Sequence, residues 1–177
     1  MAEVVEWVVV ASTPETLLGL IRDYSQRHRF LPEGWRYLRP LSEVTSGAGA
    51  QIEIKARIGP IATTHVLQLH REGDDFIDEG PPGGENYLTQ WTVQSRGEDD
   101  FEDGGDPQAP AEGRFEPYPQ AETPAATVRE AWRPMSVVQV EMQFMYGGLM
   151  GEFFARRRIR RALREMLQRL KAIAEAR

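Results

Sequence analysis

The sequence predicts an α+β domain: a curved antiparallel β-sheet of about seven strands that packs against one long C-terminal helix. Three observations support this fold class. Residues 138–146 alternate between apolar and polar side chains, as expected of a strand with one buried face. A helical apolar stripe begins directly afterwards, at about Leu149. Alternating segments with short turns precede both, which favours antiparallel strands joined in succession.

The N-terminal segment predicts one strand followed by two short helices. Residues 4–11 are rich in valine, which is typical of a strand. The sequence Ser-Thr-Pro-Glu at 12–15 then supplies an N-cap, an early proline and a capping-box glutamate for a helix. A second short helical stretch at 26–31 ends at Pro32. The two predicted helices therefore lie between the first and second strands.

The middle of the chain predicts a series of strands with a period of two. Residues 46–49 and the pair Gly59-Pro60 are expected to form turns. On the third predicted strand, Ile52, Ile54 and Ala56 share the inward face. The predicted strands of this region are 37–45, 51–58, 61–71, 76–79 and 87–95.

The final helix is predicted to run without a proline from about Leu149 to about Glu175. Its apolar residues recur at steps of three and four, and basic residues fill most other positions. Residues 156–161 include five arginines. Such a run is typical of a solvated helix face, but it also suits contacts with phosphates or anionic lipid headgroups.

Composition limits the protein class. The 177 residues are 41% hydrophobic and predict a single domain over 1–177. No apolar run approaches the 18 residues of a membrane span, and no secretory signal is visible at the N-terminus. The chain has no cysteine, which excludes disulfides, thiolate nucleophiles and cysteine-bound metals. We therefore expect a cytoplasmic protein.

Charge is distributed unevenly along the chain. The net charge is −6, although residues 147–177 hold nine Lys or Arg and three Glu. Many of the acids fall in residues 97–126, which are also rich in proline and glycine. This composition predicts an acidic insertion that does not order itself. Charge complementarity suggests that the insertion screens the basic helix, and the overall acidity argues against nucleic acid as a partner.

Several segments together resemble a known superfamily. They are Ser-Thr-Pro-Glu at 12–15 leading to 20–23, the glycine turn at 47–50, Asp-Glu-Gly-Pro at 78–81 before Trp91, and the closing helix. In these features the chain resembles the helix-grip superfamily, which includes START lipid-transfer domains, birch-pollen-allergen-like proteins and bacterial polyketide cyclase/dehydrase-like proteins. The resemblance covers most of the chain except the insertion. It implies a sheet that grips the terminal helix around an apolar cavity.

The resemblance implies binding or transport of a small hydrophobic ligand, such as a lipid or a polyketide. We expect the ligand to contact inward residues of the strands and the start of the helix. The sequence indicates no metal and no cofactor, and it does not specify an oligomeric state. The predicted ligand-binding residues are Ile54, His65, Leu67, Leu69, Tyr87, Trp91, Met142, Phe144, Met150 and Phe154.

Two alternative functions stay open. The first is a cyclase or dehydratase that uses His65, the one histidine expected inside the domain, as a base. His65 would need an orienting group, for which Asp78, Tyr87 and Glu130 are candidates, and the sequence holds no convincing catalytic constellation. The second is an interaction protein that uses the basic face of the final helix. A transient membrane contact is compatible with the same face.

Overall fold

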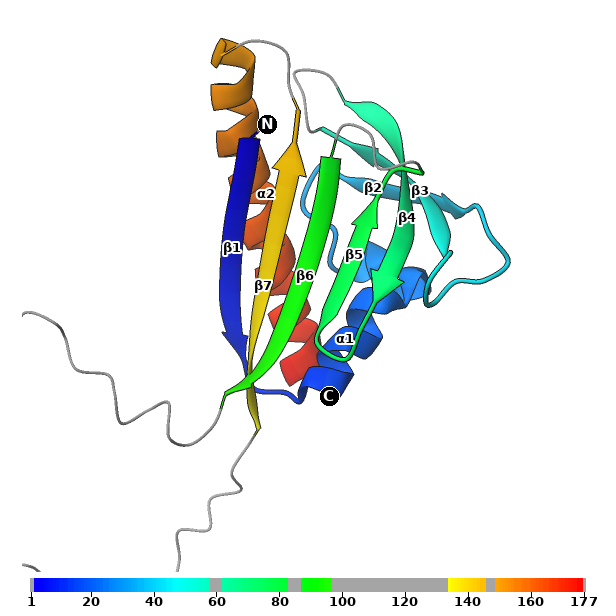
Figure 1. Ribbon diagram of the computed structural model, residues 1–177, viewed down its shortest axis with the longest axis vertical. Helices are drawn as coiled ribbons and strands as arrows, with labels where there is room; N and C mark the ends of the chain where they lie inside the picture. Colours follow the sequence, from blue (N-terminus) through cyan, green and yellow to red (C-terminus); the bar gives the residue numbers. More distant parts are fainter. Residues whose placement is uncertain (1, 58–61, 83–86, 97–133, 146–148, 177) are drawn as a thin grey trace, which may run out of the picture.

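The computed structural model describes residues 2–57, 62–82, 87–96, 134–145 and 149–176, with 149–151 described by their backbone only. The described strands form one antiparallel seven-stranded sheet in the order β1-β7-β6-β5-β4-β3-β2 (Figure 1). Its strands are β1 (Ala2–Val10), β2 (Arg36–Pro40), β3 (Gln51–Ala56), β4 (Thr63–Glu72), β5 (Phe76–Gly80), β6 (Tyr87–Arg96) and β7 (Met135–Phe144). The helices are α1 (Pro14–Arg22), the 3-10 helix η1 (Tyr24–Arg29) and α2 (Leu149–Glu175). The predicted fold class is confirmed.

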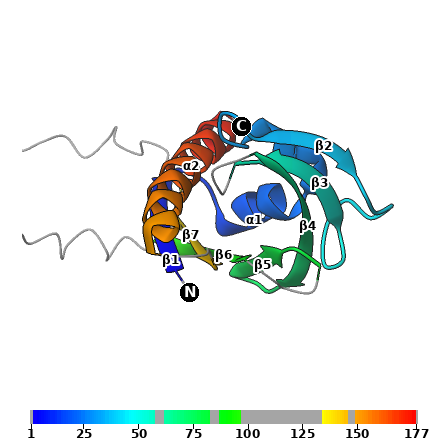
Figure 2. The same ribbon diagram turned by 90° about the horizontal axis from the view of Figure 1, so that it is seen from above.

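The sheet is strongly curved, and the helices lie on its concave side. Figure 2 shows the strands bending around α1, with α2 across the open side between β1 and β2. Two contacts fix the C-terminal part of α2. Glu175 accepts the backbone N–H of Ala11 at 3.0 Å, and Arg169 donates to the carbonyl of Leu31 at 2.8 Å. The long helix therefore closes the concavity that the sheet leaves open.

The core follows the two predicted periodicities. On β7, Val138, Val140, Met142 and Phe144 are all buried. On α2 the buried stripe steps by three and four residues, because these positions share one helix face. The buried large residues of the stripe are Ile159, Leu163, Met166, Leu167 and Leu170. The two apolar surfaces meet over the concave face of the sheet.

The start of α1 differs from the expectation in one detail. The N-cap is Thr13, whose Oγ1 accepts the N–H of Thr16 at 3.4 Å. The capping-box position three residues after this cap is therefore Thr16, whose hydroxyl lies 3.1 Å from that of Thr13. Glu15 had been expected there, and it would hold that position only if Ser12 were the cap. The early proline, Pro14, is confirmed as the first helical residue.

β2 is shorter than the predicted strand 37–45 and ends at Pro40. Directly beyond it, Leu41 still donates its N–H to the carbonyl of Gln51 on β3 at 2.9 Å. Further along the chain, Tyr24 of η1 donates its N–H to the carbonyl of Thr45 at 2.8 Å. Gly47 and Gly49 then turn the chain with φ of 84° and 90°, which confirms the predicted turn.

Some predicted features lie outside the described residues. These are the acidic insertion at 97–126, the turn at Gly59-Pro60, and the ends of the strands predicted to reach residues 58 and 146. Among the helices that the structure describes, none is long and apolar enough to cross a membrane.

Candidate ligand-binding site

A small cavity lies between the concave face of the sheet and α2. Its volume is about 20 Å³, which is close to the space that one water molecule needs. Pockets for drug-sized ligands have volumes of about 300–1,000 Å³, so a larger ligand requires the lining to move. The lining residues are Arg27, Leu31, Trp35, Ile54, Leu67, Glu79, Tyr87, Thr89, Met142, Leu163 and Met166.

The local structure explains why these side chains meet. Five adjacent strands, β3 to β7, each contribute inward residues, because side chains alternate between the two faces of a strand. Leu163 and Met166 are three residues apart on α2 and share its buried face. Arg27 comes from η1, and Leu31 and Trp35 come from the segment that follows it. The cavity therefore has a sheet wall, a helix wall and one end closed by η1.

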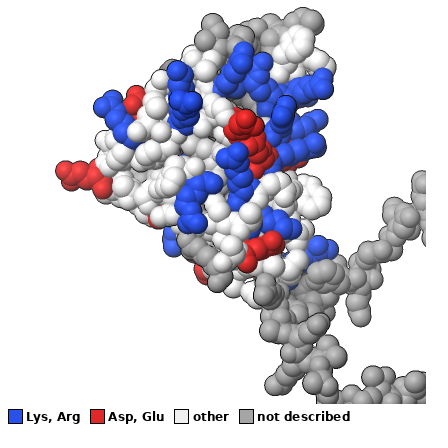
Figure 3. Space-filling model, turned by 180° about the vertical axis from the view of Figure 1, so that it is seen from behind, with Lys and Arg blue, Asp and Glu red and all other residues white. Residues whose placement is uncertain are grey.

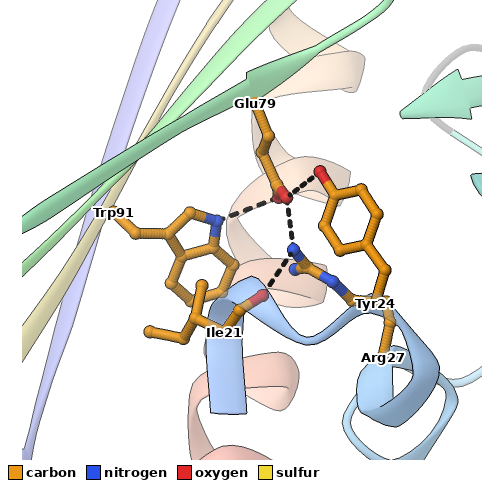
Figure 4. Close-up of polar contacts among 5 residues, drawn as sticks. All are labelled: Ile21, Tyr24, Arg27, Glu79 and Trp91. Carbon is orange, nitrogen blue, oxygen red and sulfur yellow. Dashed lines mark hydrogen bonds and ion pairs between the residues drawn. The ribbon is translucent and has the colours of Figure 1, made fainter. Parts of the chain in front are cut away.

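The carboxylate of Glu79 organises a buried polar cluster at this end (Figure 4). Trp91 Nε1 donates to Glu79 Oε1 at 2.9 Å. The Tyr24 hydroxyl donates to Glu79 Oε2 at 2.9 Å, and Arg27 Nη2 forms an ion pair with the same oxygen. The side chains of Arg27 and Glu79 are only 1% and 4% exposed. Charge pairing and hydrogen bonds together satisfy this buried carboxylate.

Aromatic rings enclose the guanidinium of Arg27. Its Cζ lies 5.0 Å from the ring centroid of Tyr24, 5.1 Å from that of Phe30 and 5.6 Å from that of Trp91. These distances allow cation–π attraction, which is strongest where water is excluded. Arg27 Nη2 also donates to the carbonyl of Ile21 at 3.3 Å, which ties the cluster to the end of α1.

Two buried polar atoms at the cavity have no hydrogen-bond partner among the described residues. They are Nε of Arg27 and the hydroxyl oxygen of Tyr87. Burial, and secondly the negative charge of Glu79, raise the pKa of Tyr87 above its ordinary value. The hydroxyl of Tyr87 therefore keeps its proton at physiological pH. The cavity thus has an apolar wall and a polar end with unused donors.

The structure places four of the predicted ligand-binding residues in the lining: Ile54, Leu67, Tyr87 and Met142. Three others, Leu69, Trp91 and Phe144, are buried in the core outside the lining. Phe154 is 58% exposed, and the side chain of Met150 lies outside the described residues.

His65 is half-buried beside the site and is not part of the lining. Its Nε2 lies 2.6 Å from the hydroxyl of Thr63, and its ring meets that of Tyr87 edge-on at 5.7 Å. Burial lowers the pKa of His65. Of the three expected partners, Tyr87 is near, Asp78 instead binds Arg71 Nε at 2.9 Å, and Glu130 lies outside the described residues.

The sequence reasoning missed Tyr24, Arg27 and Glu79. Arg27 lies in the second short helical stretch beside His28 and Arg29, a composition typical of a solvated helix, but η1 turns it into the protein. A signal for Glu79 was present, because Asp78 and Glu79 are consecutive on a strand and must face opposite sides of the sheet. One of the two carboxylates therefore had to point into the concavity.

Solved structures with the same architecture support this description. KanY matches over 99% of this chain and 99% of its own, with a TM-score of 0.62 and 22% sequence identity. A START superfamily protein from Mycobacterium smegmatis matches over 98% of this chain and 97% of its own, with a TM-score of 0.57 and 11% identity. The chain has the helix-grip fold.

The same helix-grip architecture occurs in the di-domain ARO/CYC protein BexL from the BE-7585A biosynthetic pathway. This match covers 97% of the chain and 46% of BexL, with a TM-score of 0.57 and 13% identity. No protein-family model matches the sequence, and no curated protein matches it. These comparisons establish the fold, and the chemistry of the site rests on the residues of this chain.

Proposed function

We propose that this helix-grip protein binds a small hydrophobic ligand between the sheet and α2. The observation that carries the proposal is the cavity, whose apolar wall comes from the sheet, α2 and the segment after η1. Each Å² of apolar ligand surface removed from water contributes roughly 25 cal/mol, so the wall supplies most of the affinity. The polar end sets the orientation of the ligand.

Binding requires the cavity to widen. Its present volume of about 20 Å³ does not hold a lipid or a polyketide. Met142 on β7 and Met166 on α2 both line the cavity, and their unbranched thioether side chains adapt easily to a new shape. We infer that the ligand displaces these two side chains while the backbone of the sheet keeps its position.

Trp35 marks the route of entry. It lines the cavity and also an outer groove of about 420 Å³ beside α2. Gly34, directly before it, has a φ of 81°, a conformation that other residues rarely adopt. Trp35 is thus a side chain that the groove and the cavity share, and we infer that a ligand enters beside it. The groove is lined by Glu33, Gly34, Trp35, Arg57, Ala62, Arg158, Arg161, Ala162 and Glu165.

A neutral apolar fluorophore tests the proposal. We expect N-phenyl-1-naphthylamine to bind the wild-type protein at a single saturable site with increased emission. Met166→Ala enlarges the cavity and should strengthen this binding, although it costs about 2–5 kcal/mol of stability. Titration with the fluorophore measures its affinity for each protein. Native mass spectrometry of the gently purified protein shows whether a molecule is already bound.

The matched control is Phe153→Ala, which removes an aromatic side chain that is 63% exposed on α2. Cavity binding leaves the affinity of this variant unchanged. If Phe153→Ala abolishes binding and Met166→Ala does not alter it, the fluorophore binds the surface and the proposal is wrong.

The cyclase or dehydratase alternative draws support from the similarity to BexL and from the contact of His65 with Tyr87. This alternative uses His65 as a base. It predicts that His65→Ala abolishes turnover of a poly-ketone substrate while fluorophore binding persists. Equal loss of both, or no turnover by the wild-type protein, counts against it.

A second candidate function uses the exposed face of α2 as a docking surface for an anionic membrane. Figure 3 shows Lys and Arg side chains gathered over this helix. Phe153 and Phe154 are 63% and 58% exposed at its start, with ring centroids 5.7 Å apart. Among the described residues, Arg157 and Arg161 have no acidic partner, whereas Arg164 binds Glu6 at 2.8 Å. Exposed aromatic rings beside unpaired cations suit a lipid surface better than nucleic acid.

Vesicle flotation tests this surface. We expect binding to phosphatidylcholine vesicles only when they contain phosphatidylglycerol, and weaker binding in high salt. Each basic residue near an anionic surface contributes about 1 kcal/mol, so Arg157→Glu with Arg161→Glu should weaken binding at least about tenfold. The control, Arg22→Glu with Arg36→Glu, makes the same charge change elsewhere on the surface. Equal effects of the two double variants would show that only net charge matters.

A further inference from the structure

The polar end of the cavity has more hydrogen-bond donors than the protein uses. Nε–H of Arg27 and O–H of Tyr87 are buried and have no acceptor among the described residues. A buried donor without an acceptor costs about 1–3 kcal/mol, so such groups are normally satisfied by a molecule that is not part of the chain. Both residues line the same cavity. An acceptor for these two donors would therefore lie in that cavity.

The carboxylate acceptors at this end are already engaged. The two oxygens of Glu79 accept hydrogen bonds from Trp91, Tyr24 and Arg27. An ionised carboxylate offers about four acceptor positions, so little capacity is left for a donor from the ligand. The Tyr87 hydroxyl can donate or accept, but Arg27 Nε–H can only donate, so a hydrogen-bond acceptor is the one group that satisfies both.

The charges around the cavity indicate that this acceptor is uncharged. The positive charge of Arg27 is balanced by Glu79 in a pair that is almost fully buried. A ligand carboxylate would bring a second negative charge next to Glu79 without a second cation, which is costly in a buried site. The cavity also has room for about one oxygen atom. An uncharged, single oxygen fits these limits.

We propose that the hydrophobic ligand carries an uncharged carbonyl oxygen that accepts hydrogen bonds from Tyr87 Oη–H and Arg27 Nε–H. This inference rests on the proposed function and names the chemical class of its ligand. The oxygen occupies the existing cavity, and the apolar part of the ligand lies in the space that opens beside α2. Trp35 lines both this cavity and the outer groove.

Three naphthalene compounds of similar size test the inference by isothermal titration: 2-acetylnaphthalene, 2-ethylnaphthalene and 2-naphthoate. The ketone and the hydrocarbon differ in one oxygen, and the carboxylate adds a charge. We expect the wild-type protein to bind the ketone about three- to tenfold more tightly than the hydrocarbon, which is the usual net effect of a buried hydrogen bond. The carboxylate should bind more weakly than the ketone.

Tyr87→Phe removes the donor without changing the shape of the ring. It should bind the ketone and the hydrocarbon with nearly equal affinity, while its affinity for the hydrocarbon matches that of the wild-type protein. Tyr37→Phe is the matched control, because Tyr37 lies outside the cavity lining and should keep the preference. The infrared C=O stretch of the bound ketone gives a second readout, and we expect a lower frequency in the wild-type protein than in Tyr87→Phe.

The outcomes separate the two proposals. If the hydrocarbon binds and the ketone has no advantage, or if Tyr87→Phe keeps the advantage, the carbonyl inference is wrong and the hydrophobic site stands. Tighter binding of the carboxylate than of the ketone also overturns the inference. If none of the three compounds binds, both the inference and the proposed function fail.

Discussion

At the residue scale, Glu79 and Asp78 show how position decides the role of a carboxylate. Both are buried on β5 and they face opposite sides of the sheet. Glu79 joins a pair whose cation, Arg27, is 1% exposed, whereas Asp78 pairs with Arg71, whose side chain is 71% exposed. Solvent screens the second pair and not the first.

Glu79→Gln should therefore destabilise the protein much more than Asp78→Asn. The first change leaves Arg27 as a buried charge without a partner, which costs about 3–5 kcal/mol. In the second, Arg71 returns to water, and we expect a cost of about 1 kcal/mol. Denaturant unfolding of both variants measures the difference. Similar costs would show that the Arg27–Glu79 pair is not the main polar contribution to stability.

His65 gives a prediction for pH. Burial lowers the pKa of His65 in the folded protein, so in mildly acidic solution the unfolded chain binds a proton that the folded chain does not. The contribution of His65 to stability is thus present above its ordinary pKa of about 6.5 and is lost as the pH falls below it. We expect His65→Gln to lose less thermal stability than the wild-type protein between pH 7.5 and about pH 5.5.

The exposed His28 is the control for this measurement. His28→Gln should follow the wild-type curve of melting temperature against pH. A pH dependence that His65→Gln leaves intact would assign the effect to other groups.

At the scale of elements, α2 has two faces with separate tasks. Its buried face packs on the sheet, and its exposed face carries arginines and the two phenylalanines. Glu6 on β1 holds Arg160 and Arg164 at 3.2 and 2.8 Å, which anchors part of the basic face to the sheet edge. Stability and surface binding are therefore expected to respond to different substitutions on the same helix.

Leu170→Ala and Phe154→Ala test this separation. Leu170 is completely buried, so its truncation should leave a cavity and cost about 2–5 kcal/mol. Phe154 is largely exposed, and its truncation should change stability by less than about 0.5 kcal/mol. Thermal and denaturant unfolding give both values. A large effect at Phe154 would mean that this side chain packs against the protein in solution.

At the scale of the whole molecule, the curved sheet and α2 enclose the cavity, and Trp35 lines both that cavity and the outer groove. The proposed route of entry passes this side chain. The energetic barrier to ligand entry therefore depends on how the sheet and α2 pack together, and not on any single strand.

Trp35→Ala should join the groove to the cavity and speed the entry of N-phenyl-1-naphthylamine. We expect at least about a tenfold faster association in stopped-flow fluorescence, since the change removes a large side chain from the path. Trp7→Ala, which alters a tryptophan that is 65% exposed on β1, is the control and should leave the rate unchanged. Equal association rates in all three proteins would place the entrance elsewhere.

The fold class could be predicted without coordinates, because the two apolar periodicities of the chain are local properties. The alternation that buries Ile52, Ile54 and Ala56 and the stripe of α2 follow from the geometry of a strand and a helix. For the same reason Ile54, Leu67, Tyr87 and Met142 could be assigned to the inner face before the structure was known.

The polar end of the cavity and the cavity volume depend on how the elements pack, and no local pattern predicts them. Arg27 and Glu79 are 52 residues apart, and a charged residue on a short helix gives no local sign that it will be buried. Their pairing depends on η1 packing into the concavity of the sheet. The volume of the cavity likewise depends on how closely Leu163 and Met166 approach the strands, which is a result of packing and not of sequence pattern.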